Sequence, residues 1–228
     1  MQIALALYPG VSANECEAFT LVFDRLREAE VVGVGERVGP VTGPGGSQRV
    51  DQRFADVARP DVVLVPGGLG CARAAEDAEL RAWLRTVAPR CRWMAASSTG
   101  TVVVAAAGLL ADREAATHWL AGDLLATYGS AASSRRIVEI GNVITCEGEI
   151  TAMHVALLVA LRLSGPAEVA RIRSELDRIG RDEPRAATRR WRWRPRSRRG
   201  GRGPGRPRNP ELVAPDVIEF EPLQIHPQ

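Results

Sequence analysis

The residues best suited to chemistry lie in the segment Ala96-Ser-Ser-Thr-Gly100, where a predicted buried strand runs directly into a predicted helix. Ser98 stands between two small residues, the pattern of a nucleophile elbow. On so sharp a turn the side chain points into a pocket, and N–H groups at the start of the next helix can bind an oxyanion. A Ser-Thr cap on an Ala-rich helix explains the same residues, and the local pattern alone favours that cap.

A Gly-rich turn, Pro66-Gly-Gly-Leu-Gly70, follows another apolar strand. Gly67 and Gly68 would let backbone N–H groups approach a ligand closely. The spacing is neither GxGxxG nor a P-loop, so it does not predict nucleotide binding. An ordinary strand-to-helix turn explains these glycines equally well.

Two titratable residues are further candidates. His118 lies just beyond the helix that follows Ser98 and would suit a general base, although a lone histidine is more often structural. Glu15 lies in the first turn of the first predicted helix, where a carboxylate usually faces solvent and stabilises the helix dipole. Both become candidates for catalysis only if the fold brings them to Ser98.

The remaining histidines and the cysteines show no metal-binding spacing. The chain has three His and four Cys, widely scattered and without a CxxC motif. This predicts no zinc site, no disulfide scaffold and no cofactor, and it fits a reducing cytoplasm.

Strand and helix patterns alternate over residues 1–182. Strands are predicted at Gln2–Tyr8, Val31–Gly35, Asp61–Val65 and Arg92–Ala96, with a hairpin over Arg136–Ile140 and Val143–Cys146. Helices are predicted at Asn14–Glu28, Ala75–Val87, Thr99–Leu110, Ala121–Tyr128, Ile150–Leu163 and Ala167–Ile179. The alternation predicts an α/β fold, a three-layer sandwich with a flavodoxin-like, mainly parallel sheet. Because ligands bind beyond the carboxyl ends of such strands, Glu15, Gly68 and Ser98 are expected on that side of the sheet.

Residues 183–228 differ in composition from the rest. The chain carries 30 basic residues, all Arg, and 27 acids, and 11 of the Arg lie within residues 185–208, which hold no acid. This predicts a basic, disordered Arg/Gly/Pro-rich tail, with a weak signal for a strand near Val217–Phe220. The alternation of Arg and Trp over residues 189–194 suits nucleic acid, but a solubilising tail is the favoured interpretation.

Targeting signals are not expected in this sequence. The apolar start, Met1–Tyr8, is short and has no basic lead-in, unlike a signal peptide. The longest apolar runs fall well short of the ~18 residues of a membrane span. We therefore expect a cytoplasmic protein without a membrane partner.

Several features occur in the order found in a known family. They are Gly10 with Glu15 five residues later, Pro66-Gly67-Gly68, Ser98 followed by the run 105–110, Ala116–Trp119, and Gly141–Thr145. On these features about residues 1–180 resemble the ThiJ/PfpI superfamily, which has the class I glutamine-amidotransferase-like fold. The order is more similar to the isonitrile-hydratase branch, which also resembles sensor domains of AraC-type regulators.

The resemblance implies roles for individual residues. The elbow of this family carries a Cys that an acid of the first helix contacts, whereas this chain has Ser98, so Cys-dependent activity is not expected. One reading is a hydratase or hydrolase of a small electrophile, with Ser98, Glu15 and His118 catalytic and an oxyanion site at Gly67, Gly68 and Thr99. The other reading is a non-catalytic ligand-binding or regulatory protein. Relatives are commonly homodimers, so a homodimer is expected.

Overall fold

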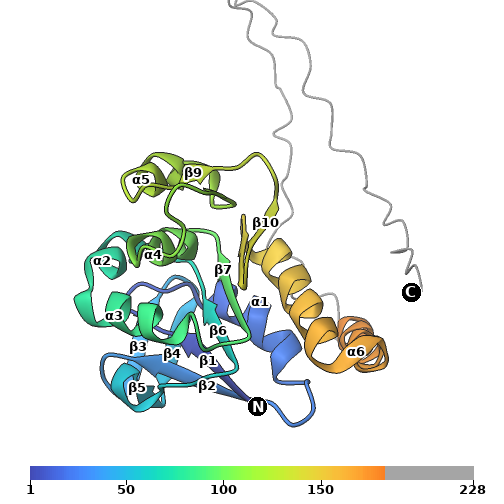
Figure 1. Ribbon diagram of the computed structural model, residues 1–228. Helices are drawn as coiled ribbons and strands as arrows, with labels where there is room; N and C mark the ends of the chain where they lie inside the picture. The colour runs from blue at the N-terminus through green and yellow to red at the C-terminus, as the bar shows by residue number, and fades with distance from the viewer. Residues whose placement is uncertain (183–228) are drawn as a thin grey trace, which may run out of the picture. The chain divides into compact units, whose positions relative to one another are not determined.

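The computed structural model describes residues 1–182. The predicted basic tail, with its disorder, its strand near Val217–Phe220 and its contacts with nucleic acid, lies outside the described residues. The core is a seven-stranded sheet between two layers of helices (Figure 1). The predicted α/β fold with a mainly parallel sheet is therefore confirmed.

The sheet has the strand order β10-β11-β7-β6-β1-β2-β5. Its strands are β1 (Gln2–Ala6), β2 (Glu30–Gly35), β5 (Gln52–Arg53), β6 (Val62–Val65), β7 (Trp93–Ser97), β10 (Ile137–Ile140) and β11 (Val143–Cys146). All neighbours are parallel except β10 and β11, which form the predicted antiparallel hairpin. All four residues of β6 are buried, as expected for a central strand covered on both faces.

Residues 1–182 contain six helices. They are α1 (Ala13–Phe23), α2 (Cys71–Glu76), α3 (Ala78–Val87), α4 (Gly100–Ala106), α5 (Gly122–Ala126) and α6 (Glu149–Asp182). α1 and α6 pack together on one face, and α4 packs beside α2 and α3 on the other (Figure 1). Smaller elements are the 3-10 turns η1 (Phe54–Asp56) and η2 (Trp119–Ala121) and the strand pairs β3 (Gly39–Gly43) with β4 (Gly46–Val50) and β8 (Glu114–Ala115) with β9 (Ala131–Ala132).

Several predicted helix boundaries were wrong. The predicted helix Ala75–Val87 is two helices, because the Asp77 side chain accepts hydrogen bonds from the N–H groups of Glu79 and Leu80 and caps α3. The helix predicted to reach Glu28 ends at Phe23. Apolar residues at helical spacing continue past the break before α3 and past the end of α1. Hydrophobic spacing alone therefore could not locate these two boundaries. The hairpin of β3 and β4 was missed because its residues are mostly polar or Gly.

Helix α6 is the one described helix that is long and apolar enough to cross a membrane. Gly165 interrupts it with a φ of 82°, so each half is shorter than the ~20 residues that a span requires. Val155, Ala156 and Val159 in its first half are fully buried in the core. This burial is typical of a core helix in a globular domain. The interruption at Gly165 agrees with the two helices predicted from the sequence over this region.

Candidate active site

A cavity of about 1000 Å³ lies beyond the carboxyl ends of the central strands. Its lining includes five of the six site residues predicted from the sequence: Glu15, Gly68, Ser98, Thr99 and His118. The sixth, Gly67, lies behind this surface, and a Cβ atom built on it would approach the Ser98 Cβ to 2.8 Å. Residues far apart in the sequence therefore converge on one place, because the ends of parallel strands share one edge of the sheet.

Ser98 lies in the connection between β7 and α4 in a strained conformation. Its φ is 55°, in the left-handed region that a non-Gly residue occupies at a cost of about 1–3 kcal/mol. Hydrogen bonds hold it on both sides: its N–H donates to the Cys146 carbonyl at 2.8 Å, and the Thr117 hydroxyl donates to its carbonyl at 2.9 Å. The neighbouring strand β11 and the segment before η2 therefore fix this turn.

We expect Thr117→Val to destabilise the protein by about 1–3 kcal/mol, because the nearly isosteric change leaves the buried Ser98 carbonyl without this donor. Denaturant unfolding measures the effect. Thr127→Val is the matched control, since the Thr127 hydroxyl donates to the Leu124 carbonyl on the surface. Equal unfolding free energies for the two variants would show that Thr117 does not support the turn.

The Gly-rich turn after β6 positions the start of α1. The Ser12 N–H donates to the Gly67 carbonyl at 2.9 Å, and Val11 pairs with Gly68 in an isolated β-bridge. A Cβ on Gly68 would lie 2.3 Å from the Gly10 carbonyl oxygen, so only glycine allows this approach. Ser12 then caps α1, which places Glu15 in the first turn of the helix.

The buried Glu15 carboxylate accepts a hydrogen bond from Ser97, a residue that was not predicted to belong to the site. The Ser97 hydroxyl donates to Glu15 Oε2 at 2.5 Å. Ser97 is fully buried and does not line the cavity, whereas Glu15 does. Ser97 therefore holds the carboxyl group from the protein side. The signal available in the sequence was that Ser97 is a polar residue at the end of a buried strand, directly before Ser98.

Burial raises the pKa of Glu15 above its usual range. Hydrogen bonding by Ser97 and Ser98 opposes this rise, and the negative charge of Glu149 adds to it. Ser98 is thus among the residues that influence the protonation of this carboxyl group, although the short hydrogen bond belongs to Ser97. A carboxyl group with a raised pKa releases and takes up a proton at higher pH than an ordinary Glu, which suits a general acid–base role.

The predicted oxyanion donors differ in availability. The Gly68 N–H donates to the Thr99 hydroxyl at 2.8 Å, and that hydroxyl lies 3.0 Å from the Gly68 carbonyl oxygen. The Gly68 N–H is therefore already used in this conformation. Thr99 also lines the cavity directly after Ser98, so its N–H is the other predicted donor at this site.

His118 forms part of the cavity wall. Its Nδ1 accepts a hydrogen bond from the Leu120 N–H at 3.3 Å, and its ring contacts the Trp119 ring with centroids 5.7 Å apart. Within residues 1–182 no hydrogen bond joins it to Ser98. The arrangement therefore differs from a Ser-His pair, and Glu15 is the acid–base group whose pKa Ser98 influences.

The cysteines offer no evident replacement for a thiol at the turn. All four are free and buried. Burial raises the pKa of Cys16 to about 12, of Cys91 to about 11 and of Cys146 to about 12. Cys71 is the one of the four that lines the cavity. Among residues 1–182, no group of three or more His, Cys, Asp or Glu side chains is placed to hold a metal ion.

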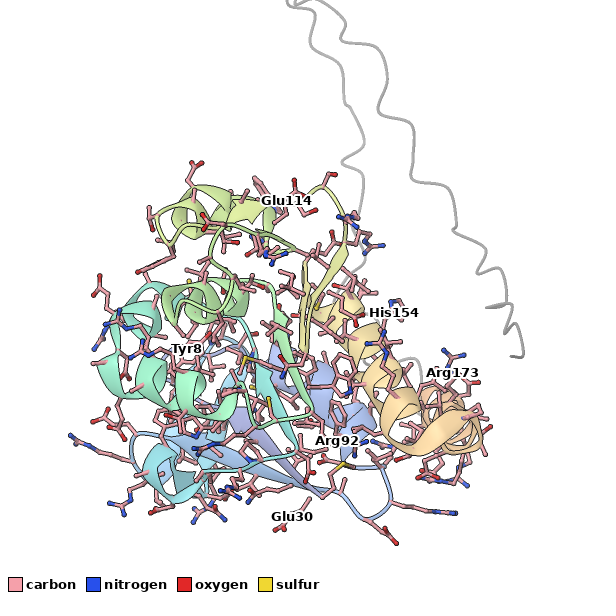
Figure 2. All side chains as sticks on the ribbon, in the orientation of Figure 1. Tyr8, Glu30, Arg92, Glu114, His154 and Arg173 are labelled. Atoms are coloured by element: carbon pink, nitrogen blue, oxygen red, sulfur yellow. The ribbon has the colours of Figure 1, made fainter. Side chains whose placement is uncertain are left out.

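Tyr8 supports the floor of the site from the interior. Figure 2 labels it inside the molecule, where its hydroxyl donates to the Pro66 carbonyl at 2.7 Å. Burial raises the pKa of Tyr8 well above its usual value, so the group stays neutral and keeps its donor proton. The end of β1 is thereby joined to the Gly-rich turn.

The family model that describes DJ-1/PfpI proteins matches residues 1–161. The chain belongs to the DJ-1/PfpI family. A solved ThiJ/PfpI family protein from Pseudomonas syringae superposes with a TM-score of 0.72 at 26% identity, over 80% of this chain and 75% of that one. The resemblance predicted from the sequence is confirmed.

Named relatives in the DJ-1/PfpI family differ in activity. An isonitrile hydratase of Pseudomonas putida is 34% identical over 72% of this chain and 73% of its own. A glutathione-independent glyoxalase of Caenorhabditis elegans is 29% identical over 72% of this chain and 89% of its own. The transcriptional regulator CdhR of Pseudomonas aeruginosa is 31% identical over 64% of this chain and 44% of its own, so this chain matches less than half of that regulator.

Proposed function

We propose that this DJ-1/PfpI protein is an enzyme that hydrates or hydrolyses a small electrophile, with Ser98 at the nucleophilic position. The observation that carries the proposal is the strained left-handed turn of Ser98 beside the buried Glu15 carboxyl group in one cavity. A nucleophile elbow has this strand–turn–helix geometry. The isonitrile hydratase among the relatives supports the same reaction class.

In the proposed mechanism Glu15 accepts the Ser98 hydroxyl proton as the oxygen attacks an electrophilic carbon. The bond from Ser98 Oγ to that carbon forms, and Glu15 returns the proton to the atom that gains electron density. A water molecule then attacks the same carbon, and the bond from Ser98 Oγ to that carbon breaks. One water proton passes through Glu15 to Ser98 Oγ, the other stays with the product, and the product leaves. The Thr99 N–H stabilises the negative charge, and His118 shapes the wall.

Turnover tests this role of Ser98 directly. A panel of isonitriles and dicarbonyls is incubated with the wild-type chain, and formamide or hydroxyacid products are followed by NMR. We expect Ser98→Ala to lower turnover at least about 100-fold without unfolding the protein, because the attacking oxygen is lost. Ser98→Cys is expected to retain or gain activity, because a thiolate forms more readily. Turnover by Ser98→Ala at the wild-type rate would remove Ser98 from the mechanism.

A second candidate function is ligand binding without turnover, as in a regulatory protein. Two observations favour it, because both groups already have hydrogen-bond partners within the protein. Glu15 Oε2 accepts a hydrogen bond from the Ser97 hydroxyl, and the Gly68 N–H donates one to the Thr99 hydroxyl. The regulator among the relatives is consistent with it. Saturable binding of panel compounds by the wild-type chain, with no product from any of them, would favour this function over catalysis.

We also propose a homodimer in the cytoplasm. The free thiols of all four cysteines suit a reducing compartment. Sedimentation velocity of the full chain tests the dimer, and fractionation of cells that express it tests the location.

A further inference from the structure

Large apolar side chains are exposed around the mouth of the cavity. Six such side chains are exposed in the described part of the chain, and four of them line this cavity. The four are Leu69 (87% exposed), Trp119 (82%), Leu120 (68%) and Ile150 (66%). A scattered exposed apolar residue is ordinary, but a group that surrounds one cavity marks a binding surface.

Three separate segments supply this apolar rim. Leu69 belongs to the Gly-rich turn, Trp119 and Leu120 belong to η2, and Ile150 lies in the first turn of α6. The polar groups Glu15 and Ser98 lie in the same cavity but are buried, so they lie deeper than the rim. The cavity thus has a polar floor and an apolar entrance.

The charged groups of the lining are mainly acidic. Glu15, Glu147 and Glu149 contribute carboxylates. The guanidinium of Arg136 is already paired, because its Nε lies 2.5 Å from Glu147 Oε1. Among the lining residues that the structure describes, no other Arg is present. An anionic ligand would therefore meet like charges and no free cation, which costs binding energy.

We propose that the cavity selects an uncharged molecule that has a small polar head and a compact apolar body, such as an aromatic or saturated ring. The head lies at Ser98 and Glu15, and the body packs on the apolar rim. The placement of the head rests on the function proposed above, whereas the selection by charge and apolarity does not. A ring-sized body fits because a cavity of about 1000 Å³ has ample room for it.

Equilibrium binding to the full chain tests this selection, with benzamide, benzoate and acetamide as probes in ligand-observed NMR. Benzamide and benzoate share size and shape, and acetamide lacks the apolar body. We expect benzamide to bind at least 10-fold more tightly than either of the others. Trp119→Ala should weaken benzamide binding at least 5-fold, whereas Val38→Ala, which removes an exposed apolar side chain outside the lining, should not.

A second variant tests the charge argument by itself. Glu147→Gln leaves Arg136 without its carboxylate, so benzoate affinity should rise at least 3-fold while benzamide affinity stays unchanged. Glu139→Gln is the matched control, because it leaves Arg162 unpaired outside the lining. Equal effects of both variants on benzoate would overturn the charge argument.

Other outcomes separate this inference from the proposed catalysis. Ser98→Ala should abolish turnover and weaken benzamide binding, because the polar head loses a partner, yet it should still bind benzamide more tightly than benzoate. Wild-type protein that binds benzoate as well as benzamide would overturn the inference and leave the role of Ser98 intact. If Trp119→Ala leaves benzamide binding unchanged and instead converts a dimer to a monomer in sedimentation, the rim is a contact between copies of the chain and the inference fails.

Discussion

Glu15→Gln is expected to abolish activity while making the protein more stable at neutral pH. Glutamine keeps the size of the side chain and can still accept the hydrogen bond that Ser97 donates. It cannot exchange a proton with Ser98, so turnover should fall at least about 100-fold. The gain in stability follows because burial penalises the charged carboxylate, and glutamine carries no charge to bury.

The sign of the pH dependence follows from the raised pKa. The folded protein holds the Glu15 proton more tightly than the unfolded chain does. The stability that this proton contributes is complete below the unfolded pKa, which is about 4.3, and is lost as the pH rises through the folded value. Each unit of difference corresponds to about 1.4 kcal/mol. The variant should therefore exceed the wild type in unfolding free energy at pH 7.5, but not near pH 4.

Denaturant unfolding at the two pH values measures this difference. Glu17→Gln is the matched control, because it makes the same chemical change on an exposed residue of the same helix. The control should leave stability within about 0.5 kcal/mol of the wild type at both pH values. A Glu15→Gln variant that is less stable than the wild type at pH 7.5 would mean that the site stabilises the charged carboxylate instead.

Gly100→Ala is expected to destabilise the protein strongly. A Cβ on the buried Gly100 would lie 2.2 Å from the Val65 carbonyl oxygen and 2.7 Å from that of Pro66. These are backbone atoms at the end of β6, so no side-chain rotation can relieve the overlap. We expect a loss of about 3 kcal/mol or more, at the upper end for overpacking of a core.

Thermal and denaturant unfolding test this prediction, with Gly148→Ala as the matched control. No heavy atom outside the adjoining residues lies within 4 Å of a Cβ built on Gly148. The control should therefore change stability by no more than about 0.5 kcal/mol. If Gly100→Ala were equally mild, the start of α4 could move away from β6, and Ser98 would not be held as tightly as its contacts indicate.

Contacts from neighbouring elements hold the groups of the site in place. The end of β6 fixes α4, β11 and Thr117 fix the turn of Ser98, and Ser97 fixes Glu15. The strained turn and the buried carboxyl group both reduce stability, and the surrounding contacts compensate for them. Such local costs are typical of functional sites, where reactive groups are held in conformations that they would not adopt alone.

The sequence was sufficient to predict the alternation of strands and helices. It also placed Ser98 and the Gly-rich turn at the ends of buried strands. Apolar periodicity is a local property, and glycine is required wherever backbones approach closely, so both can be recognised without coordinates. The ends of helices were harder to predict, because the Asp77 cap and the early end of α1 depend on a few local hydrogen bonds and turns.

The partners of these residues became known from the fold. Ser97 and Glu15 are 82 positions apart, yet the Ser97 hydroxyl binds the carboxylate; Gly68 likewise meets Thr99, 31 positions away. The apolar rim joins Leu69, Trp119 and Ile150 from three segments. Contacts of this kind depend on the order of strands in the sheet and on the direction of each side chain. No local pattern in the sequence carries that information.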